Sequence, residues 1–299
     1  MSTVIGLDIG GTNLRIGLLR DSVWERGATY STHELFAEGD EIARLGSLIE
    51  TFRGTEKADA VSVGFPSPIA ADGKTVLNAP NIIKKDGSNA FKGKNVADPL
   101  TALLGMPVLV NKDANHLLHY DAHTANADGI LVGCYVGTGF GSAVMIDGQL
   151  FKGKNGSAME AGHIPFYHGE RVCGCGKTGC AECYCAGRAA REYLEPLYPG
   201  KDVGRIFREH ADDEPVAAFV EAVAITVATL VNLFDPHMLF LGGGVLSSDF
   251  PKDSLSAAIL RHTMAPWPRE GLDIRYTQHD AFAGVVGAAL CAQAALQRM

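Results

Sequence analysis

The stretch TVIGLDIGGTNLRIGLLR, residues 3–20, sets the fold. Its two apolar runs, 3–9 and 14–20, predict buried strands, and Gly10-Gly11-Thr12-Asn13 between them predicts a hairpin turn. Backbone N–H groups in such a turn can hold an anion, and Thr12 adds a hydroxyl. The acid Asp8 stands directly before Ile9 and the glycines. The turn is therefore a candidate phosphate site, with an ordinary β-hairpin as the alternative.

A second stretch repeats this pattern in the other half of the chain. A strand is predicted over 130–136, followed by the glycine-rich turn 137–141 with the sequence GTGFG and a strand over 142–146. These glycines lack the spacing of a dinucleotide site, and a strand rather than a helix follows them. Two strand–turn–strand units, one opening each half, predict a duplicated fold that holds a nucleotide phosphate between the halves.

Length and composition describe a globular protein of two domains. The chain has 299 residues, of which 46% are hydrophobic and 20% charged. A net charge of −8 disfavours a nucleic-acid surface, because such surfaces are rich in lysine and arginine. No signal peptide and no run as long as a membrane span is visible. We expect a cytoplasmic protein without nucleic-acid or membrane partners, and clustered cysteines fit a reducing compartment.

Two further strands are predicted to end on residues that can carry chemistry. The strand 107–113 ends at Lys112-Asp113, and a helix follows from 114 to about 127. Asp113 thus lies at a strand-to-helix junction, a common place for functional residues in α/β sheets, although a plain helix N-cap is the competing interpretation. The strand 239–241 precedes Gly242-Gly243-Gly244, which permits close approach of a flat ligand such as a nucleoside. A flexible loop is the alternative there.

The remaining elements complete the α/β pattern. A strand is predicted over 60–65, and helices over 186–197, 215–234 and 281–296.

A cluster of soft metal ligands lies within residues 160–182, EAGHIPFYHGERVCGCGKTGCAE. Three thiols and one imidazole make a complete tetrahedral Zn²⁺ set, which leaves no position for water and indicates a structural site. Buried free cysteines are the alternative interpretation. The acids Glu160 and Glu182 bracket the cluster. The predicted ligands are His163, Cys173, Cys175 and Cys180.

Several of these segments together resemble the ROK family, which groups bacterial sugar kinases with sugar-responsive repressors. The resemblance implies an α/β fold shared with hexokinase and actin, with duplicated mixed sheets in two domains and a cleft between them. It places the smaller domain at 1–113, the larger domain with the zinc loop at 114–283, and the terminal helix, about 284–299, back on the first domain. The matching segments are LDIGGT at 7–12, DAN at 113–115, VGTGFGSAVMIDGQL at 136–150, EAGH at 160–163, CGCGKTGCAE at 173–182 and LGGG at 241–244.

The resemblance also implies a role for each matching residue. Asp113 matches the general base that takes the proton of a sugar hydroxyl, and Asp8 matches a residue that helps to position Mg²⁺. His163 matches a residue that binds the sugar with one ring nitrogen and zinc with the other. The implied cofactors are ATP, Mg²⁺ and structural Zn²⁺, and a homodimer is expected. The sugar-binding positions are Asn81, Glu160, His163 and Glu182; the phosphate turns are Gly10, Gly11, Thr12, Asn13 and Thr138, Gly139; the adenosine positions are Gly243 and Gly244.

Departures from the common pattern point to the sugar. Lys112 stands where many glucokinases of the family carry Asn, and a basic residue there resembles the D-allose kinases. Further likenesses to that group are GFPSP at 64–68, the extra Cys185, and FDPHMLFLGGGVL at 234–246. We therefore predict ATP-dependent phosphorylation of the 6-hydroxyl of D-allose, with Lys112 in the sugar site.

Other functions compete with this prediction. The alternatives within the family are a glucokinase or a hexokinase for fructose, mannose or an N-acetylhexosamine. A sugar-responsive repressor is the candidate from another class, but the first core strand starts at Thr3 and leaves no room for a helix-turn-helix module ahead of it. A catalytically inactive sugar-binding protein is disfavoured by Asp8 and Asp113. Cys183 and Cys185 are alternative metal ligands, for which small buried side chains are the preferred interpretation.

Overall fold

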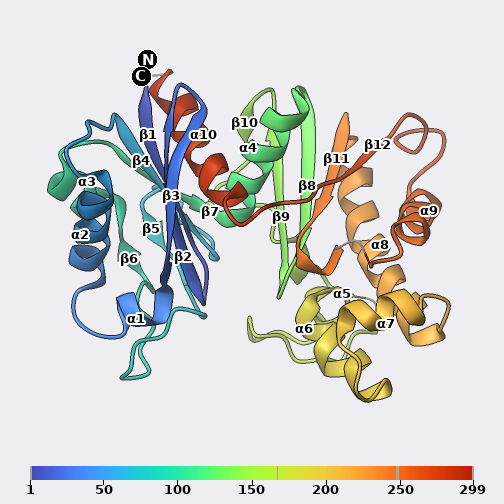
Figure 1. The fold of residues 1–299 in the computed structure, drawn as a ribbon. Helices are drawn as coiled ribbons and strands as arrows, with labels where there is room; N and C mark the ends of the chain where they lie inside the picture. Colours follow the sequence, from blue (N-terminus) through green and yellow to red (C-terminus); the bar gives the residue numbers. More distant parts are fainter. Residues whose placement is uncertain (1, 167, 247–248, 298–299) are drawn as a thin grey trace. The chain divides into compact units, whose positions relative to one another are not determined.

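The computed structural model describes residues 2–166, 168–246 and 249–297. The chain divides into two compact units (Figure 1). The first combines the residues up to Ala125, the segment Lys152–Ala158 and the chain from Asp280 onward; the second combines Asn126–Phe151 with Met159–His279. This division differs from the predicted boundary at 113, because the helix that begins there packs against the C-terminal helix of the first unit.

The first unit is built on a mixed five-stranded sheet with the order β3-β2-β1-β4-β7. β1 pairs antiparallel with β2 and parallel with β4, and β4 pairs parallel with β7. The three parallel strands end at one edge of the sheet. The elements are β1 (Thr3–Ile9), β2 (Asn13–Arg20), β3 (Val23–Ser31), α1 (Thr32–Phe36), α2 (Glu41–Arg53), β4 (Ala60–Phe65), β5 (Thr75–Val76), β6 (Lys94–Asn95), α3 (Ala97–Leu104), β7 (Val108–Lys112), α4 (Asp113–Ala125) and α10 (Ala283–Leu296).

The second unit repeats this sheet with the order β10-β9-β8-β11-β12. β8 pairs antiparallel with β9 and parallel with β11, and β11 pairs parallel with β12. The elements are β8 (Ile130–Val136), β9 (Phe140–Ile146), β10 (Gln149–Leu150), η1 (Ala161–His163), α5 (Glu182–Cys185), α6 (Gly187–Ala189), η2 (Ala190–Leu194), η3 (Glu195–Leu197), α7 (Val203–Glu209), α8 (Glu214–Phe234), β11 (Met238–Gly242), η4 (Gly244–Leu246), α9 (Lys252–His262) and β12 (Asp273–Tyr276).

The two sheets confirm the predicted duplication. Each begins with an apolar strand, a glycine turn and a second strand, and each continues with two parallel strands in the same order. The turns after β1 and β8 are hairpin turns, as the sequence predicts, because the flanking strands pair in register across them. β9 begins at Phe140, two residues before the predicted strand.

Strand alternation divides the first unit into two packed layers. Ile5, Leu7 and Ile9 of β1 join the core that also contains the buried side chains of α2 and α3. Val4 of the same strand joins Ala289 and Ala292 of α10 in a separate cluster. Successive side chains of a strand point to opposite faces, so the even-numbered residues of β1, including Asp8, lie on the α10 face.

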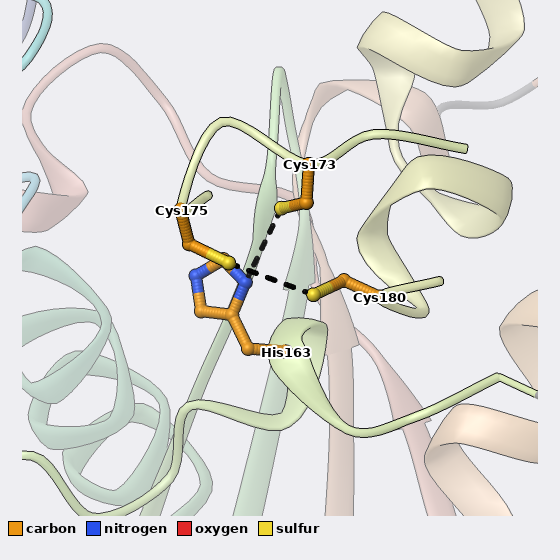
Figure 2. A group of neighbouring side chains, drawn as sticks. All are labelled: His163, Cys173, Cys175 and Cys180. Atoms are coloured by element: carbon orange, nitrogen blue, oxygen red, sulfur yellow. Dashed lines mark hydrogen bonds between the residues drawn. The ribbon is translucent and has the colours of Figure 1, made fainter. Parts of the chain in front are cut away.

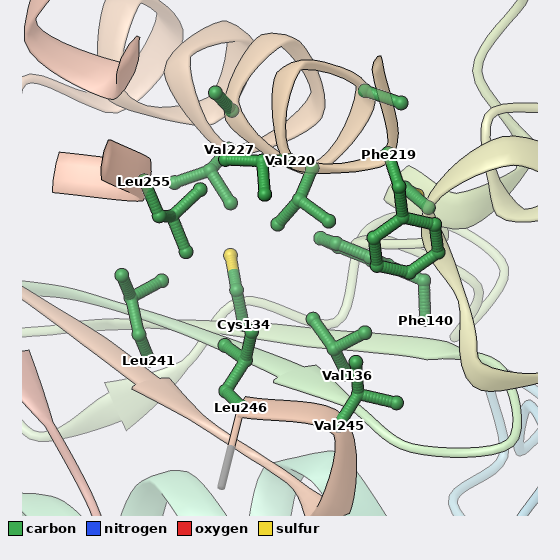
Figure 3. Packing of buried hydrophobic residues seen from close by; sticks show 14 of the residues in the cluster. Cys134, Val136, Phe140, Phe219, Val220, Val227, Leu241, Val245, Leu246 and Leu255 are labelled. Atoms are coloured by element: carbon green, nitrogen blue, oxygen red, sulfur yellow. The ribbon is translucent and has the colours of Figure 1, made fainter. Parts of the chain in front are cut away.

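The core of the second unit forms between its sheet and α8 (Figure 3). Cys134, Val136 and Phe140 from the sheet pack with Phe219 and Val220 of the helix. Among the residues that the structure describes, α8 is the helix whose length and composition would also suit a membrane span, with 61% of its apolar window buried inside the fold. This burial is typical of a core helix.

One predicted helix differs in form. The segment 186–197 is helical but consists of α6, the π-helical η2 and the 3₁₀ turn η3 in place of one regular helix. Pro196 has no backbone N–H to donate and restricts the residue before it, which limits a regular helix at this point.

Candidate active site and metal centre

The candidate catalytic residues of the first unit lie where its parallel strands end. Asp8 is the second-last residue of β1, and β7 ends at Lys112, directly before Asp113. Asp113 is the first residue of α4, and its Oδ1 accepts a 2.6 Å hydrogen bond from the N–H of Ala114. The carboxyl ends of parallel strands are the usual binding edge of α/β sheets.

The negative charge of Asp113 affects the pKa of Asp8. Burial and the negative charge of Asp113 raise the pKa of Asp8 to about 6, and Arg15 on the paired strand partly offsets both effects. Two carboxylates that disfavour each other's charge make a favourable place for a cation. The residues present therefore fit a Mg²⁺ ion beside Asp8.

The first glycine turn is held from both ends. The N–H of Gly10 donates to the carbonyl oxygen of Asn13 at 2.9 Å, and Thr32 donates through its N–H to Thr12 and through its hydroxyl to Gly10. Gly11 and Thr12 are exposed at the tip. A side chain on Gly11 would lie 2.9 Å from Cβ of Asn81, so the exposed Asn81 packs against this turn. A predicted phosphate residue and a predicted sugar residue thus lie side by side.

The second glycine turn is anchored by the helical segment after the cysteines. The N–H groups of Gly187 and Arg188 donate to the carbonyl oxygens of Gly137 and Thr138 at 2.8 and 3.0 Å. The side chain of Thr138 is exposed and available to a ligand. The turn is therefore rigid at its carbonyl side.

The predicted adenosine residues follow β11. Gly243 has a φ of +98°, and a Cβ there would lie 2.5 Å from the carbonyl oxygen of Val136 at the end of β8. The next residue, Gly244, is exposed, and nothing lies within 4 Å of the place its Cβ would take. The strand edge that carries the second turn thus also carries an open stretch of backbone.

The four predicted metal ligands converge (Figure 2). All four ligand atoms lie within 4.8 Å of one another. Sγ of Cys173 lies 3.6 Å from Nδ1 of His163, and Sγ of Cys175 lies 3.6 Å from Sγ of Cys180. Tetrahedral zinc with Zn–S bonds of about 2.3 Å places two sulfurs about 3.8 Å apart, and a sulfur and a nitrogen about 3.5 Å apart. The cluster therefore has the size of a zinc site.

The chemistry of the thiols also fits a cation. Burial, together with the neighbouring thiols of Cys175 and Cys173, raises the pKa of Cys180 to about 12. Three thiolates this close need a positive charge among them, which a bound Zn²⁺ supplies. The loop itself is closed by backbone hydrogen bonds such as that from Phe166 to Gly179, and Gly179 has a φ of +79° with no room for a side chain.

His163 is oriented so that its two ring nitrogens face different groups. Nδ1 faces Cys173, whereas Nε2 lies 3.9 Å from Oε2 of Glu160. The carbonyl oxygen of His163 also accepts a 2.8 Å bond from Nζ of Lys177. One nitrogen is thus turned to the metal cluster and the other to a predicted sugar-binding carboxylate.

Glu182 connects the end of the cysteine loop to the second glycine turn. Its Oε2 accepts a 2.9 Å hydrogen bond from the N–H of Phe140, and a Cβ on Gly139 would lie 2.5 Å from that oxygen. Glu160, His163, Glu182 and the second turn accordingly belong to the second unit, while Asp8, the first turn, Asn81, Lys112 and Asp113 belong to the first.

Three residues of the site region could not be found from the sequence. Arg15 pairs with Asp8 across β1 and β2, and the only available signal was a charge inside an apolar strand. Ser62 and His116 form a buried pair beneath α4, with Oγ and Nε2 3.1 Å apart. No pattern within a short window of the sequence predicts a contact between residues 54 positions apart.

Comparisons with known proteins agree over nearly the whole chain. A family model described as the ROK family matches residues 4–295. An N-acetyl-D-glucosamine kinase of Vibrio parahaemolyticus is 31% identical, covering 95% of this chain and 97% of the relative.

Two solved structures extend the likeness. A ROK hexokinase from Thermus thermophilus has a TM-score of 0.84 at 28% identity, covering 99% of this chain and 100% of the other. A ROK family glucokinase from Streptomyces griseus, in complex with glucose and AMPPNP, has a TM-score of 0.76 at 26% identity, covering 98% and 100%.

Proposed function

Because this chain belongs to the ROK family, we propose that it is an ATP-dependent kinase for the 6-hydroxyl of a hexose, and that the hexose is D-allose. The likeness to a ROK hexokinase confirms the predicted two-domain, hexokinase-like α/β fold. The single observation that supports catalysis best is the interacting pair Asp8 and Asp113 at the end of parallel strands. In a sugar-binding protein without activity, two neighbouring carboxylates whose negative charges repel each other would serve no purpose.

Asp113 is the proposed general base. A sugar hydroxyl is a weak nucleophile until a positioned carboxylate accepts its proton. Asp113 is half-buried at the first position of α4, where the helix N-terminus favours a negative charge. The hydrogen bond from Ala114 engages Oδ1 and holds the carboxylate in one orientation.

The glycine turns are the proposed phosphate contacts, Gly10 to Asn13 in one unit and Thr138-Gly139 in the other. Phosphoryl transfer needs in-line positioning and donors for the charge that spreads over the phosphoryl oxygens. Asp8 would hold Mg²⁺, which when bound neutralises part of that charge. Gly243 and Gly244 are the proposed adenosine contacts: Gly244 supplies open backbone, and Gly243 lies against the backbone of Val136.

The proposed sugar contacts of the second unit are Glu160, His163 and Glu182. Carboxylates and an imidazole nitrogen pair well with hydroxyls, and their orientation decides which hydroxyls are recognised. A structural Zn²⁺ on His163, Cys173, Cys175 and Cys180 would hold the imidazole with Nε2 toward Glu160. Asn81 and Lys112 are the proposed sugar contacts of the first unit.

The identity of the sugar rests on Lys112, which ends β7 directly before the proposed base. A cation there can donate to a hydroxyl but not accept from one, unlike the Asn of many relatives. The second candidate is N-acetyl-D-glucosamine, because the Vibrio relative at 31% identity bears that activity in its name. We also expect the enzyme to be a homodimer, which its mass in solution tests.

The deciding experiment measures ADP release by purified protein with D-allose, D-glucose, D-mannose, D-fructose and N-acetyl-D-glucosamine. We expect the highest kcat/KM for D-allose. A kcat/KM at least tenfold higher for N-acetyl-D-glucosamine than for D-allose would support the kinase activity but would identify N-acetyl-D-glucosamine as the sugar. Sugar binding without turnover of any hexose would instead indicate a sugar-responsive regulator and overturn the proposal.

A further inference from the structure

We propose that His116 is a positioning residue for Asp113, which it holds by fastening the first turn of α4 to the sheet. The inference rests on the proposed role of Asp113 as general base. His116 follows Asp113 by three residues, and residues three apart lie on the same face of an α-helix. A hydrogen bond made at His116 therefore fixes the direction in which the helix presents Asp113.

The fastening point is a buried hydrogen bond. His116 is 1% exposed, and its Nε2 lies 3.1 Å from Oγ of Ser62, which is fully buried on β4. Ser62 lies on the face of β4 opposite Val61 and Val63, whose side chains join the α2 and α3 core. This bond is thus a polar link in the layer between sheet and α4.

The imidazole is also confined by close contacts. Its Nδ1 has no hydrogen-bond partner among the described residues and lies over Gly64, where an added Cβ would be 2.7 Å away. Gly64 pairs in register with Asp8 of β1. On the other side, a Cβ on Gly287 of α10 would meet the carbonyl oxygen of His116 at 1.9 Å. The first turn of α4, which follows Asp113, is therefore tightly packed between β4 and α10.

The imidazole stays neutral, so this link holds at every working pH. Burial, together with the nearby charges of His119 and Lys152, lowers the pKa of His116 to about 3. The tautomer that leaves no donor unpaired carries its proton on Nε2 and donates it to Ser62. A protonated His116 would instead add a cation close to Asp8 and Asp113.

A base works only within a narrow geometry, which is why this link matters. A displacement of about 1 Å at the reacting groups can cost on the order of 10²-fold in rate. The bond between Ser62 and His116 limits tilt and rotation of α4 at the turn that carries Asp113. It touches no proposed sugar or nucleotide contact, so its loss should affect turnover far more than binding.

The test is a double-mutant cycle on the full-length enzyme. His116→Leu removes the hydrogen bond with a similar volume, Ser62→Ala removes it from the other side with a smaller change, and His116→Gln restores a donor. We expect the first two to lower kcat about tenfold with sugar KM unchanged within twofold, and His116→Gln to recover most of the loss. His123→Leu, at an exposed position of the same helix, is the matched control and should leave kcat unchanged.

The cycle is completed in the Asp113→Asn background. If His116 acts through Asp113, adding Ser62→Ala to Asp113→Asn should change the residual kcat less than twofold. An equal loss in both backgrounds would overturn the inference while leaving Asp113 as base. If Asp113→Asn alone keeps most of the turnover, the base assignment falls and this inference falls with it. Should His116→Leu fold poorly, Ser62→Ala decides between the same outcomes by itself.

Discussion

Oε2 of Glu182 accepts a 2.9 Å hydrogen bond from the backbone N–H of Phe140, the first residue of β9. The bond joins the end of the cysteine loop to the start of β9. Because Oε2 is engaged there, Glu182 has only part of its acceptor capacity left for a sugar. The carboxylate of Glu182 is thus both a proposed sugar contact and a hydrogen-bond acceptor that holds the backbone next to the proposed phosphate turn.

The two tasks of Glu182 can be separated by substitution. Glu182→Gln keeps an oxygen for Phe140 but loses the charge, so we expect a sugar KM raised about tenfold with an unchanged melting temperature. Glu182→Ala also leaves the N–H of Phe140 unpaired, at a cost of about 1–3 kcal/mol in the free energy of unfolding. Glu192→Gln, an exposed glutamate nearby, is the control. Equal melting temperatures for all three variants would contradict the structural task.

Zinc content tests the metal site. We expect about one Zn²⁺ per chain by elemental analysis of protein purified without chelators, and its loss in Cys173→Ser. The matched control is Cys183→Ser, because Cys183 lies close in sequence but outside the four converging ligands. Wild-type protein without zinc, or a Cys183→Ser variant that loses it, would reject this ligand set.

Asp113→Asn tests the general base. An amide cannot accept the proton, so we expect kcat to fall by at least ~10²-fold with a nearly unchanged KM. As a helix cap, Asn would replace Asp with little loss, since the two residues cap about equally well. A variant with the wild-type melting temperature and more than a tenth of the wild-type kcat would mean that Asp113 is only a helix cap and not the general base.

The raised pKa of Asp8 predicts a pH-dependent cost to stability. An acid whose pKa is about 6 in the folded protein and near 4 when unfolded binds more protons in the folded state between these values. Stability from this group therefore falls as pH rises from 4 to 6, by of order 2–3 kcal/mol, and the full cost is present above pH 6. Without Mg²⁺ and nucleotide, Asp8→Asn should melt several degrees higher than wild type at pH 8 but not at pH 4.

A thermal melt at both pH values checks this expectation, with the exposed Asp212→Asn as control. The same Asp8→Asn protein should lose nearly all kinase activity, because the stabilised site no longer attracts a cation. A variant that is no more stable than wild type at pH 8 would show that the Asp8 carboxylate is not disfavoured in the fold.

Lys112 is the residue proposed to distinguish the configuration at C3 of the sugar, where D-allose and D-glucose differ. A buried polar group left unpaired by one epimer costs about 1–3 kcal/mol, which corresponds to roughly 5- to 150-fold in rate. Lys112→Asn should therefore lower the ratio of allose to glucose kcat/KM, whereas Lys57→Asn at an exposed position should not. An unaltered ratio would remove Lys112 from the specificity argument.

Sequence reasoning succeeded where the signal is local. The hairpins around Gly10-Gly11 and Gly137–Gly139 follow from apolar runs joined by glycine turns, and the convergence of His163 with the three cysteines follows from their spacing in the sequence. β3 was not predicted, because it is a largely exposed strand without an apolar run.

The parts of the site that escaped prediction depend on contacts across the fold. Arg15 is informative only once β2 is known to lie against β1 with Arg15 opposite Asp8. Ser62 and His116 meet only because β4 lies beneath α4, and either residue alone is an ordinary serine or histidine. Long-range pairing of this kind has no signature within a window of neighbouring residues.

The packing of α10 against β1 sets an order of events during synthesis on the ribosome. β1 is among the first segments to emerge, yet Val4 finds its partners Ala289 and Ala292 only after about 285 further residues are made. At about 5–20 residues per second this delay is roughly 15–55 s. During that time the part of the first sheet that α10 covers stays exposed, whereas the second unit, complete at His279, can already be folded. Nascent chains paused before residue 283 should therefore be the form that engages chaperones.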